Sequence, residues 1–226
     1  MIFGYRLQRL NTPYFEVQDN IDLQNRMDNP MNRLFKRSLD LFLSILFLIL
    51  IAPWLFPLVS IIILLGSRGS PFFIQKRTGR KRKTFYCFKF RTMVKNENAN
   101  RLQVQIDDVR ITKVGKFLRE THIDELPQIL NVLMGQMSIV GPRPHMLRHN
   151  VEYAQLSPNY HLRHAAKPGL TGLAQVRGYH GMITDKEDYE NRLSSDIEYI
   201  QNWTLFGDIE IFVMTTLKII LRIDQQ

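Results

Sequence analysis

At 226 residues, 45% of them hydrophobic, the chain has room for one domain with its own core plus appendages. Its net charge of +9 is uneven, because residues 31–95 hold thirteen Lys and Arg against one Asp, a net +12, and the rest is slightly acidic. Such a basic block favours a local polyanion, either anionic lipid headgroups or nucleic acid. The single cysteine, Cys87, excludes an internal disulfide and fits a reducing compartment.

The first seventy residues divide into a mixed extension and an apolar segment. Residues 1–30 lack a clear period and end at Asn29–Pro30, so we expect an extension that packs on the domain or stays mobile. No charged residue occurs from Leu41 to Ser67, which is long enough to enter a bilayer but starts too far along the chain for a secretory signal peptide. Lipid is therefore the expected partner of the basic block, with no nucleic acid bound, and we expect a membrane enzyme facing the cytoplasm.

Two prolines, Pro53 and Pro57, interrupt the apolar segment, and each removes a helical hydrogen bond. Basic residues flank the segment on both sides, so a spanning helix would carry the second cluster across the bilayer, against the positive-inside tendency. A helix bent at Ala52–Pro53 keeps both clusters on one side, and each half of about twelve residues is roughly 18 Å long, too short to span. These features predict a re-entrant membrane helix over residues 31–70; the alternative is an ordinary proline-kinked transmembrane helix.

The segment that follows, residues 71–205, is predicted to be a cytoplasmic catalytic domain of α-rich α+β class. Alternating aromatic residues in 71–95 indicate a short strand or a hairpin arm near the surface. An apolar helix is expected over 124–136, a turn-rich loop over 168–172, and a charged, solvent-facing helix over 186–203.

The C-terminal segment, residues 206–226, is predicted to be an amphipathic helix. It begins with a plausible N-cap at Asp208 and continues to Ile223 with apolar residues around most of its circumference. A core helix and an interfacial helix lying on lipid headgroups are both compatible with this pattern. The overall expectation is a membrane-associated catalytic domain with a re-entrant N-terminal helix and amphipathic helices at the interface.

The chemistry is concentrated between Arg119 and Pro144. Asp124 and Glu125 stand together at the mouth of the apolar helix, and Arg143 lies between two prolines. A carboxylate offers a nucleophile or a metal ligand, and a guanidinium with a fixed backbone offers a phosphate clamp, a combination suited to phosphoryl transfer.

Purely structural explanations of the same residues remain open. Asp is a common N-cap and Glu is favoured in a first helical turn, so the acidic pair is compatible with a purely structural role. A rigid surface turn would equally explain Arg143 between its prolines. The histidines lack zinc-site spacing, and neither a glycine-rich phosphate loop nor a dinucleotide fingerprint is present in the sequence.

Several long motifs together resemble one family, the bacterial sugar transferases, which are monotopic polyprenyl-phosphate phosphoglycosyl transferases. The resemblance covers roughly residues 36–220, in order. Two departures are Arg82, where the family often has a glycine, and His122, where it usually has a small hydroxyl residue. The matching motifs are KRSLD (Lys36–Asp40), SPFFIQKRTG (Ser70–Gly79), FKFRTM (Phe88–Met93), DVRITKVGKFLR (Asp108–Arg119), DELPQ (Asp124–Gln128), NVLMGQMSIVGPRP (Asn131–Pro144), KPGLTGLAQVRG (Lys167–Gly178) and DIEYIQNW (Asp196–Trp203).

This resemblance implies an enzyme of the bacterial inner (cytoplasmic) membrane that moves a sugar-1-phosphate from a UDP-sugar to undecaprenyl phosphate, releasing UMP and starting polysaccharide assembly. It further implies Mg²⁺, with Asp124 as nucleophile and metal ligand and Glu125 as its partner. Arg143 and Arg119 are the implied phosphate contacts.

Lys89 and Arg91 are weaker candidates for the same task, since a solvated strand face also explains them. The tail motifs favour a hexose, glucose or galactose, and a homo-oligomer is left open. The competing interpretations are a non-catalytic basic protein of the membrane surface and a metal-dependent phosphodiesterase.

Overall fold

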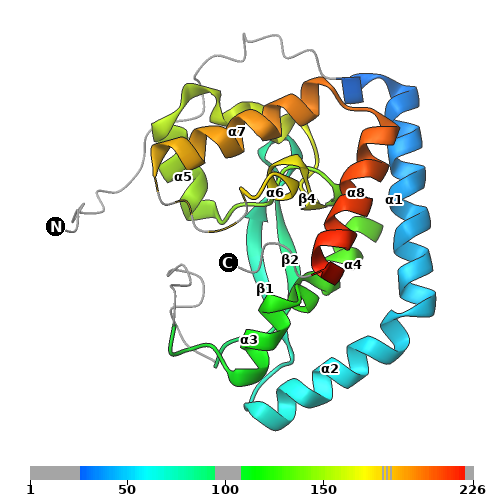
Figure 1. The fold of residues 1–226 in the computed structure, drawn as a ribbon, viewed down its shortest axis with the longest axis vertical. Helices are drawn as coiled ribbons and strands as arrows, with labels where there is room; N and C mark the ends of the chain where they lie inside the picture. The colour runs from blue at the N-terminus through cyan, green and yellow to red at the C-terminus, as the bar shows by residue number, and fades with distance from the viewer. Residues whose placement is uncertain (1–25, 95–107, 180, 182, 184, 222–226) are drawn as a thin grey trace, which may run out of the picture.

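A computed structural model describes residues 26–94, 108–179, 181, 183 and 185–221 (Figure 1). This part of the chain is rich in helices and holds two small sheets, which confirms the expected helical content. Residues 1–25 of the expected extension lie outside the described residues, and the division into four segments stays a prediction. The elements in chain order are η1 (Arg26–Asp28), α1 (Pro30–Leu50), α2 (Ala52–Gly66), β1 (Phe72–Thr78), η2 (Arg80–Arg82), β2 (Thr84–Phe90), α3 (Lys113–Glu120), η3 (Ile123–Gln128), α4 (Ile129–Leu133), β3 (Ser138–Val140), α5 (Leu147–Leu156), η4 (Pro158–Ala165), β4 (Gly169–Thr171), α6 (Leu173–Val176), α7 (Lys186–Gln201) and α8 (Leu205–Leu221).

The expected hairpin is confirmed. Strands β1 and β2 pair antiparallel, with Phe72 opposite Phe90 at one end and Thr78 opposite Thr84 at the other. In the connecting turn, Lys81 and Arg82 adopt left-handed backbone, with φ of 52° and 59°. Arg82 is the position where the family often has glycine, and the left-handed conformation explains that preference, because only glycine adopts it without steric cost.

The prediction of a loop over 168–172 is wrong in part, because Gly169–Thr171 forms strand β4, parallel to β3. Glycines allow the backbones of the two strands to approach closely here. A Cβ built on Gly169 would lie 2.1 Å from the backbone nitrogen of Gly141, so only glycine fits.

Helices α1 and α2 meet at a 64° bend. The break falls at Ile51, one residue before the bend expected at Ala52–Pro53. Pro53 lacks the N–H that would continue α1 and is tolerated in the first turn of α2. Among the described residues, no single helix is both long and apolar enough to cross a bilayer, whereas α1 and α2 together have the length and composition for a broken span or a re-entrant loop.

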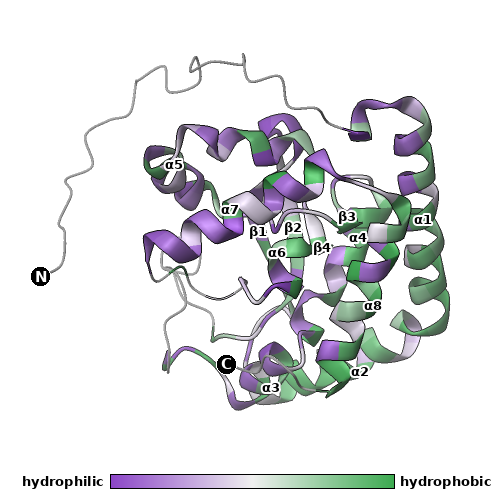
Figure 2. Cartoon of the chain, turned by 45° about the horizontal axis from the view of Figure 1, so that its top comes forward, coloured by the Kyte–Doolittle hydropathy of each residue, from purple (hydrophilic) through white to green (hydrophobic). Residues whose placement is uncertain are grey.

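Helix α1 buries three polar residues, whereas many of its apolar residues are exposed. Its buried residues are Lys36, Asp40 and Ser44, spaced four apart on one face. The Asp40 carboxylate accepts hydrogen bonds from the hydroxyl of Ser138 and the backbone N–H of Ile139, both at 2.9 Å, which ties α1 to β3. Figure 2 shows hydrophobic residues gathered on α1, α2 and α8, whereas α5 and α7 are mainly hydrophilic.

Helix α8 corrects two expectations. It begins at Leu205, one turn earlier than expected, and Thr204 caps it by accepting a hydrogen bond from the N–H of Gly207. Asp208 is therefore a buried residue of the first turn and not an N-cap. Only Asp208 and Ile211 are buried among the described α8 residues, so the core-helix alternative is wrong: α8 lies beside α1 with most of its apolar residues exposed.

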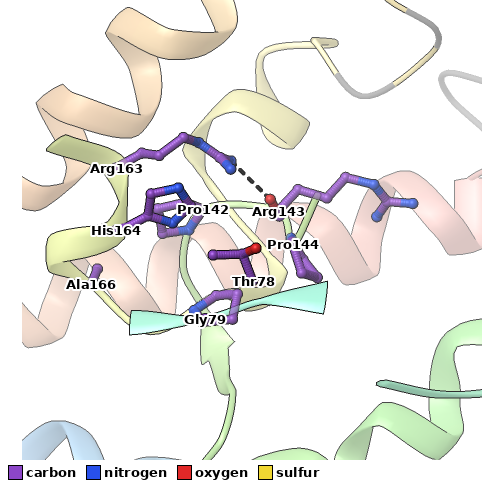
Figure 3. Close-up of a pocket in the computed structure, with 9 residues that line it drawn as sticks. Thr78, Gly79, Pro142, Arg143, Pro144, Arg163, His164 and Ala166 are labelled. Atoms are coloured by element: carbon purple, nitrogen blue, oxygen red, sulfur yellow. Dashed lines mark hydrogen bonds between the residues drawn. The ribbon is translucent and has the colours of Figure 1, made fainter. Parts of the chain in front are cut away.

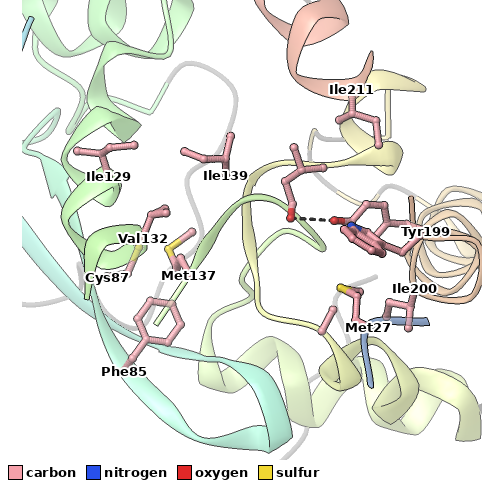
Figure 4. Packing of buried hydrophobic residues seen from close by; sticks show 13 residues of the cluster. Met27, Phe85, Cys87, Ile129, Val132, Met137, Ile139, Tyr199, Ile200 and Ile211 are labelled. Atoms are coloured by element: carbon pink, nitrogen blue, oxygen red, sulfur yellow. Dashed lines mark hydrogen bonds between the residues drawn. The ribbon is translucent and has the colours of Figure 1, made fainter. Parts of the chain in front are cut away.

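Helix α7 is only partly the solvent-facing helix that its charges indicate. One face buries seven side chains, including the charged Arg192 and Asp196. The hydroxyl of Tyr199 bonds the carbonyl oxygen of Val140 at 3.0 Å, so α7 is fixed to β3 (Figure 4). The main core cluster around this contact joins β2, α4, β3 and α7, and it supports the short helices that carry the acidic pair.

Candidate active site

The acidic pair lies in η3, a short 3₁₀ helix that follows α3 after two residues. His122 has a φ of 55°, in the left-handed region, and separates the two helices. The helix expected over 124–136 thus begins as η3 and continues as α4, which ends at Leu133. Asp124 stands inside the first turn and caps nothing, so the N-cap explanation for this residue is wrong.

Glu125 is the centre of a charged cluster. Its carboxylate receives both terminal nitrogens of Arg143, at 2.6 and 3.0 Å, and the ammonium of Lys89 at 2.5 Å. Burial alone would raise the pKa of Glu125, but the charges and hydrogen bonds of Arg143 and Lys89 hold it well below its usual range. Glu125 is therefore ionised and fully engaged, which makes it a poor general base.

Asp124 is the opposite case. Its side chain is buried, with 8% of the residue exposed, and no described residue donates a hydrogen bond to its carboxylate. Burial raises the pKa of Asp124 to about 6, against the nearby positive charge of Lys89 and with the repulsion of Glu125. The stabilisation that a helix N-terminus gives to an ionised carboxylate is outweighed here by desolvation, yet the group is still mostly ionised at neutral pH. It is a carboxylate with free lone pairs.

The loop that carries Arg143 is held inside the domain. Gly141, Pro142 and Pro144 are buried, so the alternative of a rigid surface turn is wrong, while 30% of the Arg143 side chain stays exposed. Two nitrogens of its guanidinium bond Glu125, and its other N–H groups are available for a phosphate.

Arg119 and Arg91 take different places. The Nε of Arg119 donates to the hydroxyl of Thr92 at 2.8 Å. Burial lowers the pKa of Arg119, and the charge of Asp124 is the main influence that opposes this, so Arg119 stands beside the acidic pair. Arg91 instead bonds the carbonyl oxygens of Ser67 and Arg68, each at 2.7 Å. Its geometry is that of a cap on the C-terminus of α2, which does not support the expected substrate contact.

An apolar cavity of about 580 Å³ adjoins the cluster. Its walls come mainly from α1, η3, α4, α6 and α8, and Glu125, Arg143 and His122 are among its polar lining residues. Leu46 and Phe47 of α1 and Phe212 and Ile219 of α8 are among its apolar ones. We call this cavity the α1–α8 groove. Burial lowers the pKa of His122, so this side chain is neutral at pH 7.

The sequence did not point to this groove, since the residues of its walls come from elements more than a hundred positions apart. His122 was noticed only as a departure from the family pattern. An outward apolar stripe on α1 opposite its polar stripe is the signal that would have found one wall.

Magnesium was tested against the residues present. No group of three or more His, Cys, Asp or Glu side chains able to hold a metal occurs among the described residues. Mg²⁺ is often held by one or two carboxylates together with waters and substrate phosphates, and the unpaired carboxylate of Asp124 fits that pattern. Glu125 does not, because its oxygens are taken up by Arg143 and Lys89.

Comparison with known proteins identifies the family. The family described as bacterial sugar transferase matches residues 31–222, and the chain belongs to it. The chain is 45% identical to a UDP-glucose:undecaprenyl-phosphate glucose-1-phosphate transferase of Klebsiella pneumoniae, over 96% of this chain and 47% of that protein. It is 46% identical to the protein of the same name in Escherichia coli K12, over 90% of this chain and 44% of the relative.

A shorter relative matches nearly end to end. An exopolysaccharide production protein PSS of Rhizobium leguminosarum is 40% identical over 85% of this chain and 98% of its own length. The chain spans less than half the length of the Klebsiella and Escherichia relatives. The family resemblance inferred from the motifs is confirmed.

Proposed function

We propose that the chain is a phosphoglycosyl transferase that moves a hexose-1-phosphate from a UDP-sugar to undecaprenyl phosphate and releases UMP. The observation that carries this proposal is the buried, unpaired carboxylate of Asp124, beside a cluster of cations suited to phosphate. Glu125 and Arg143 of that cluster also line an apolar groove. The names of the relatives support the donor and the acceptor, and glucose is the leading sugar because two of them are named for it.

The reaction divides into two displacements at one phosphorus. An Asp124 oxygen attacks the phosphorus that carries the sugar, a P–O bond to the carboxylate forms, and the bond to UMP breaks. A phosphate oxygen of undecaprenyl phosphate then attacks the same phosphorus, and the bond to Asp124 breaks. Covalent catalysis of this kind replaces one difficult transfer with two easier ones.

The surrounding residues prepare Asp124 for attack. Glu125 orients Arg143 and Lys89, so that both cations already occupy fixed positions when a diphosphate arrives. Arg119, beside Asp124, adds a further positive charge. We propose Asp124 as the protein ligand of Mg²⁺, which when bound neutralises phosphate charge.

The outward apolar faces of α1, α2 and α8 support attachment to a membrane. Exposed apolar surface of this extent on a soluble domain would be a liability, whereas lipid accepts it. We propose that α1 and α2 form a re-entrant helix in the bacterial inner membrane, with the catalytic domain on the cytoplasmic face. Cysteines placed at Asn32 and Ser70 should then react only from the cytoplasm, and periplasmic labelling of either would contradict this topology.

The α1–α8 groove supports a lipid acceptor. Most of its lining side chains are apolar, and Arg143 and Glu125 also belong to its lining, so an isoprenoid chain in the groove could keep its phosphate near the cations. The basic turn at Arg80–Lys83 lies at the other end of the β1–β2 hairpin from α2, about 20 Å away for strands of this length. Lipid phosphate at the site is therefore attributed to Lys89 and Arg143 rather than to that turn.

Release of UMP tests the function directly. Purified protein with undecaprenyl phosphate, Mg²⁺ and a panel of UDP-sugars should release UMP, and Asp124→Ala should not. A membrane-surface binding protein would show no release with any donor, and its membrane role would survive Asp124→Ala. A phosphodiesterase would release UMP with water alone, without the lipid acceptor.

A further inference from the structure

The backbone of the Arg143 loop is held at each successive carbonyl. The carbonyl oxygen of Pro142 accepts from the N–H of Gly169 at 2.9 Å, and that of Pro144 from the guanidinium of Arg77 at 3.0 Å. Between them, the carbonyl oxygen of Arg143 accepts from the guanidinium of Arg163 at 2.8 Å (Figure 3). Backbone polar groups in a buried loop need such partners, but two of these three come from arginine side chains of distant elements.

Arg163 is itself fixed by an ion pair. Its Nε and one terminal nitrogen donate to the same carboxylate oxygen of Asp196 on α7, at 2.9 and 2.7 Å. Both side chains are 3% exposed, and the guanidinium lies 5.5 Å from the ring centre of Tyr160. Figure 3 shows the guanidinium of Arg163 reaching the Arg143 carbonyl, while the Arg143 side chain runs away from it, out of the small pocket drawn there.

A buried ion pair of this kind contributes little net stability, because desolvation offsets the attraction of the two charges. Its effect here is geometric. The same guanidinium nitrogen that bonds Asp196 also bonds the Arg143 carbonyl, so α7 and the loop share one donor. Since the loop residue has proline on either side, fixing its carbonyl leaves little freedom in the direction of its side chain.

We propose that Arg163, held by Asp196, is a positioning residue that directs the guanidinium of Arg143 towards Glu125 and the donor phosphates. The catalytic part of this inference rests on the proposed function. Arg163 contacts neither Asp124 nor Glu125, so its influence on the reaction passes through Arg143. The Arg163–Asp196 ion pair also gives a role to the buried face of α7. Asp196 is the first residue of the family motif DIEYIQNW.

A double-mutant cycle separates positioning from general structural support. Arg163→Lys keeps the charge but loses the fork that serves Asp196 and the carbonyl together, and it should lower kcat/KM for UDP-glucose about ten- to a hundred-fold, as displacement of a positioning group by about 1 Å does. In the Arg143→Lys background the same change should have much less effect, because the group to be positioned is already altered. Equal factors in both backgrounds would overturn the proposal.

Arg148→Lys is the matched control. Arg148 follows the same loop on α5 and forms an exposed ion pair with Glu152 at 2.7 Å. Its replacement makes the same chemical change without touching the Arg143 carbonyl, so kcat/KM should stay within about two-fold of wild type. If folding of Arg163→Lys fails, the double replacement Arg163→Met with Asp196→Leu removes both charges and keeps the volume apolar. It should fold and still lose the activity; full activity in it would contradict positioning.

A second readout does not depend on turnover. Phenylglyoxal reacts with accessible guanidinium groups, and the rate at the Arg143 peptide can be followed by mass spectrometry. Arg143 released from its Glu125 geometry should react several times faster in Arg163→Lys than in wild type or Arg148→Lys, and equal rates would refute positioning. If wild type releases no UMP while this labelling difference appears, the proposed function fails and the positioning role stands.

Discussion

Two buried aspartates show how differently this fold treats a carboxylate. Asp208 lies where α1, α7 and α8 meet, and it accepts hydrogen bonds from Lys36 at 2.7 Å, Tyr199 at 2.8 Å and Trp203 at 3.0 Å. Asp124 is buried as well, but no described residue donates a hydrogen bond to it, and its pKa is raised to about 6. One carboxylate holds helices together, whereas the other keeps the unpaired oxygens that the proposed nucleophile needs.

The comparison shows that Asp124 is a position where the fold is less stable than it could be. A buried carboxylate without donors is unfavourable, and such groups persist at functional sites. Next to Asp124, the cations that could have satisfied it are directed to Glu125 instead. Asp124 therefore keeps lone pairs for phosphorus or metal.

The largest effect on stability is expected at the structural aspartate. Asp208→Asn should lower the free energy of unfolding by about 3 kcal/mol, because the buried Lys36 ammonium loses the carboxylate that it is hydrogen-bonded to. Asp28→Asn is the control, since its carboxylate pairs with Arg80 at the surface and is two-thirds exposed. Denaturant unfolding in detergent measures the stability of both variants. Equal small losses of stability would show that the buried hydrogen-bond network does not hold the helices together.

Replacement of the reactive aspartate should act in the opposite direction. The folded pKa of Asp124, about 6, lies above the ordinary 3.8, so the cost of its ionisation to folding appears as pH rises from 3.8 to 6 and is constant above that range. Asp124→Asn should therefore raise the free energy of unfolding of metal-free protein at pH 7.5, by up to about 3 kcal/mol. The gain should vanish below pH 4, and a loss of stability at pH 7.5 would count against an unpaired carboxylate.

A smaller effect, on catalysis alone, is expected at the phosphate clamp. Arg143→Lys keeps the charge but loses the two-pronged contact, so kcat/KM should fall roughly ten- to a hundred-fold, on the order of 1.4–3 kcal/mol. Steady-state UMP release measures it. Wild-type activity in this variant would show that Arg143 acts only as a point charge or as a structural residue.

The sequence predicted the local features of both regions. The acidic pair, the arginine between prolines and the break before Pro53 all depend on residues close together in the chain, where spacing and proline chemistry are informative. The β1–β2 hairpin was predictable for the same reason. The structure then joined Lys89 to Glu125, a contact that the sequence did not indicate, since Lys89 was predicted only as a weaker phosphate contact.

Long-range pairing was not predictable in this way. Lys36 and Asp208 lie 172 positions apart, and Asp208 at the start of an apolar stretch looked like an ordinary cap. The raised pKa of Asp124 depends on burial by elements that no local pattern specifies. Lys36, Asp40 and Ser44, at every fourth position of a helix whose second half is largely apolar, were the available signal that this face of α1 packs on the domain.

The central claim is that Asp124 becomes covalently attached to the sugar phosphate. The most direct measurement is the intact mass of wild-type protein incubated with UDP-glucose and Mg²⁺ without lipid acceptor. The account predicts a mass increase of one hexose phosphate, located on Asp124, together with exchange of labelled UMP into UDP-glucose, and neither signal in Asp124→Asn. An enzyme that turns over with undecaprenyl phosphate but shows no adduct, and exchanges UMP only when the lipid is present, would contradict it and would mean direct transfer in a ternary complex.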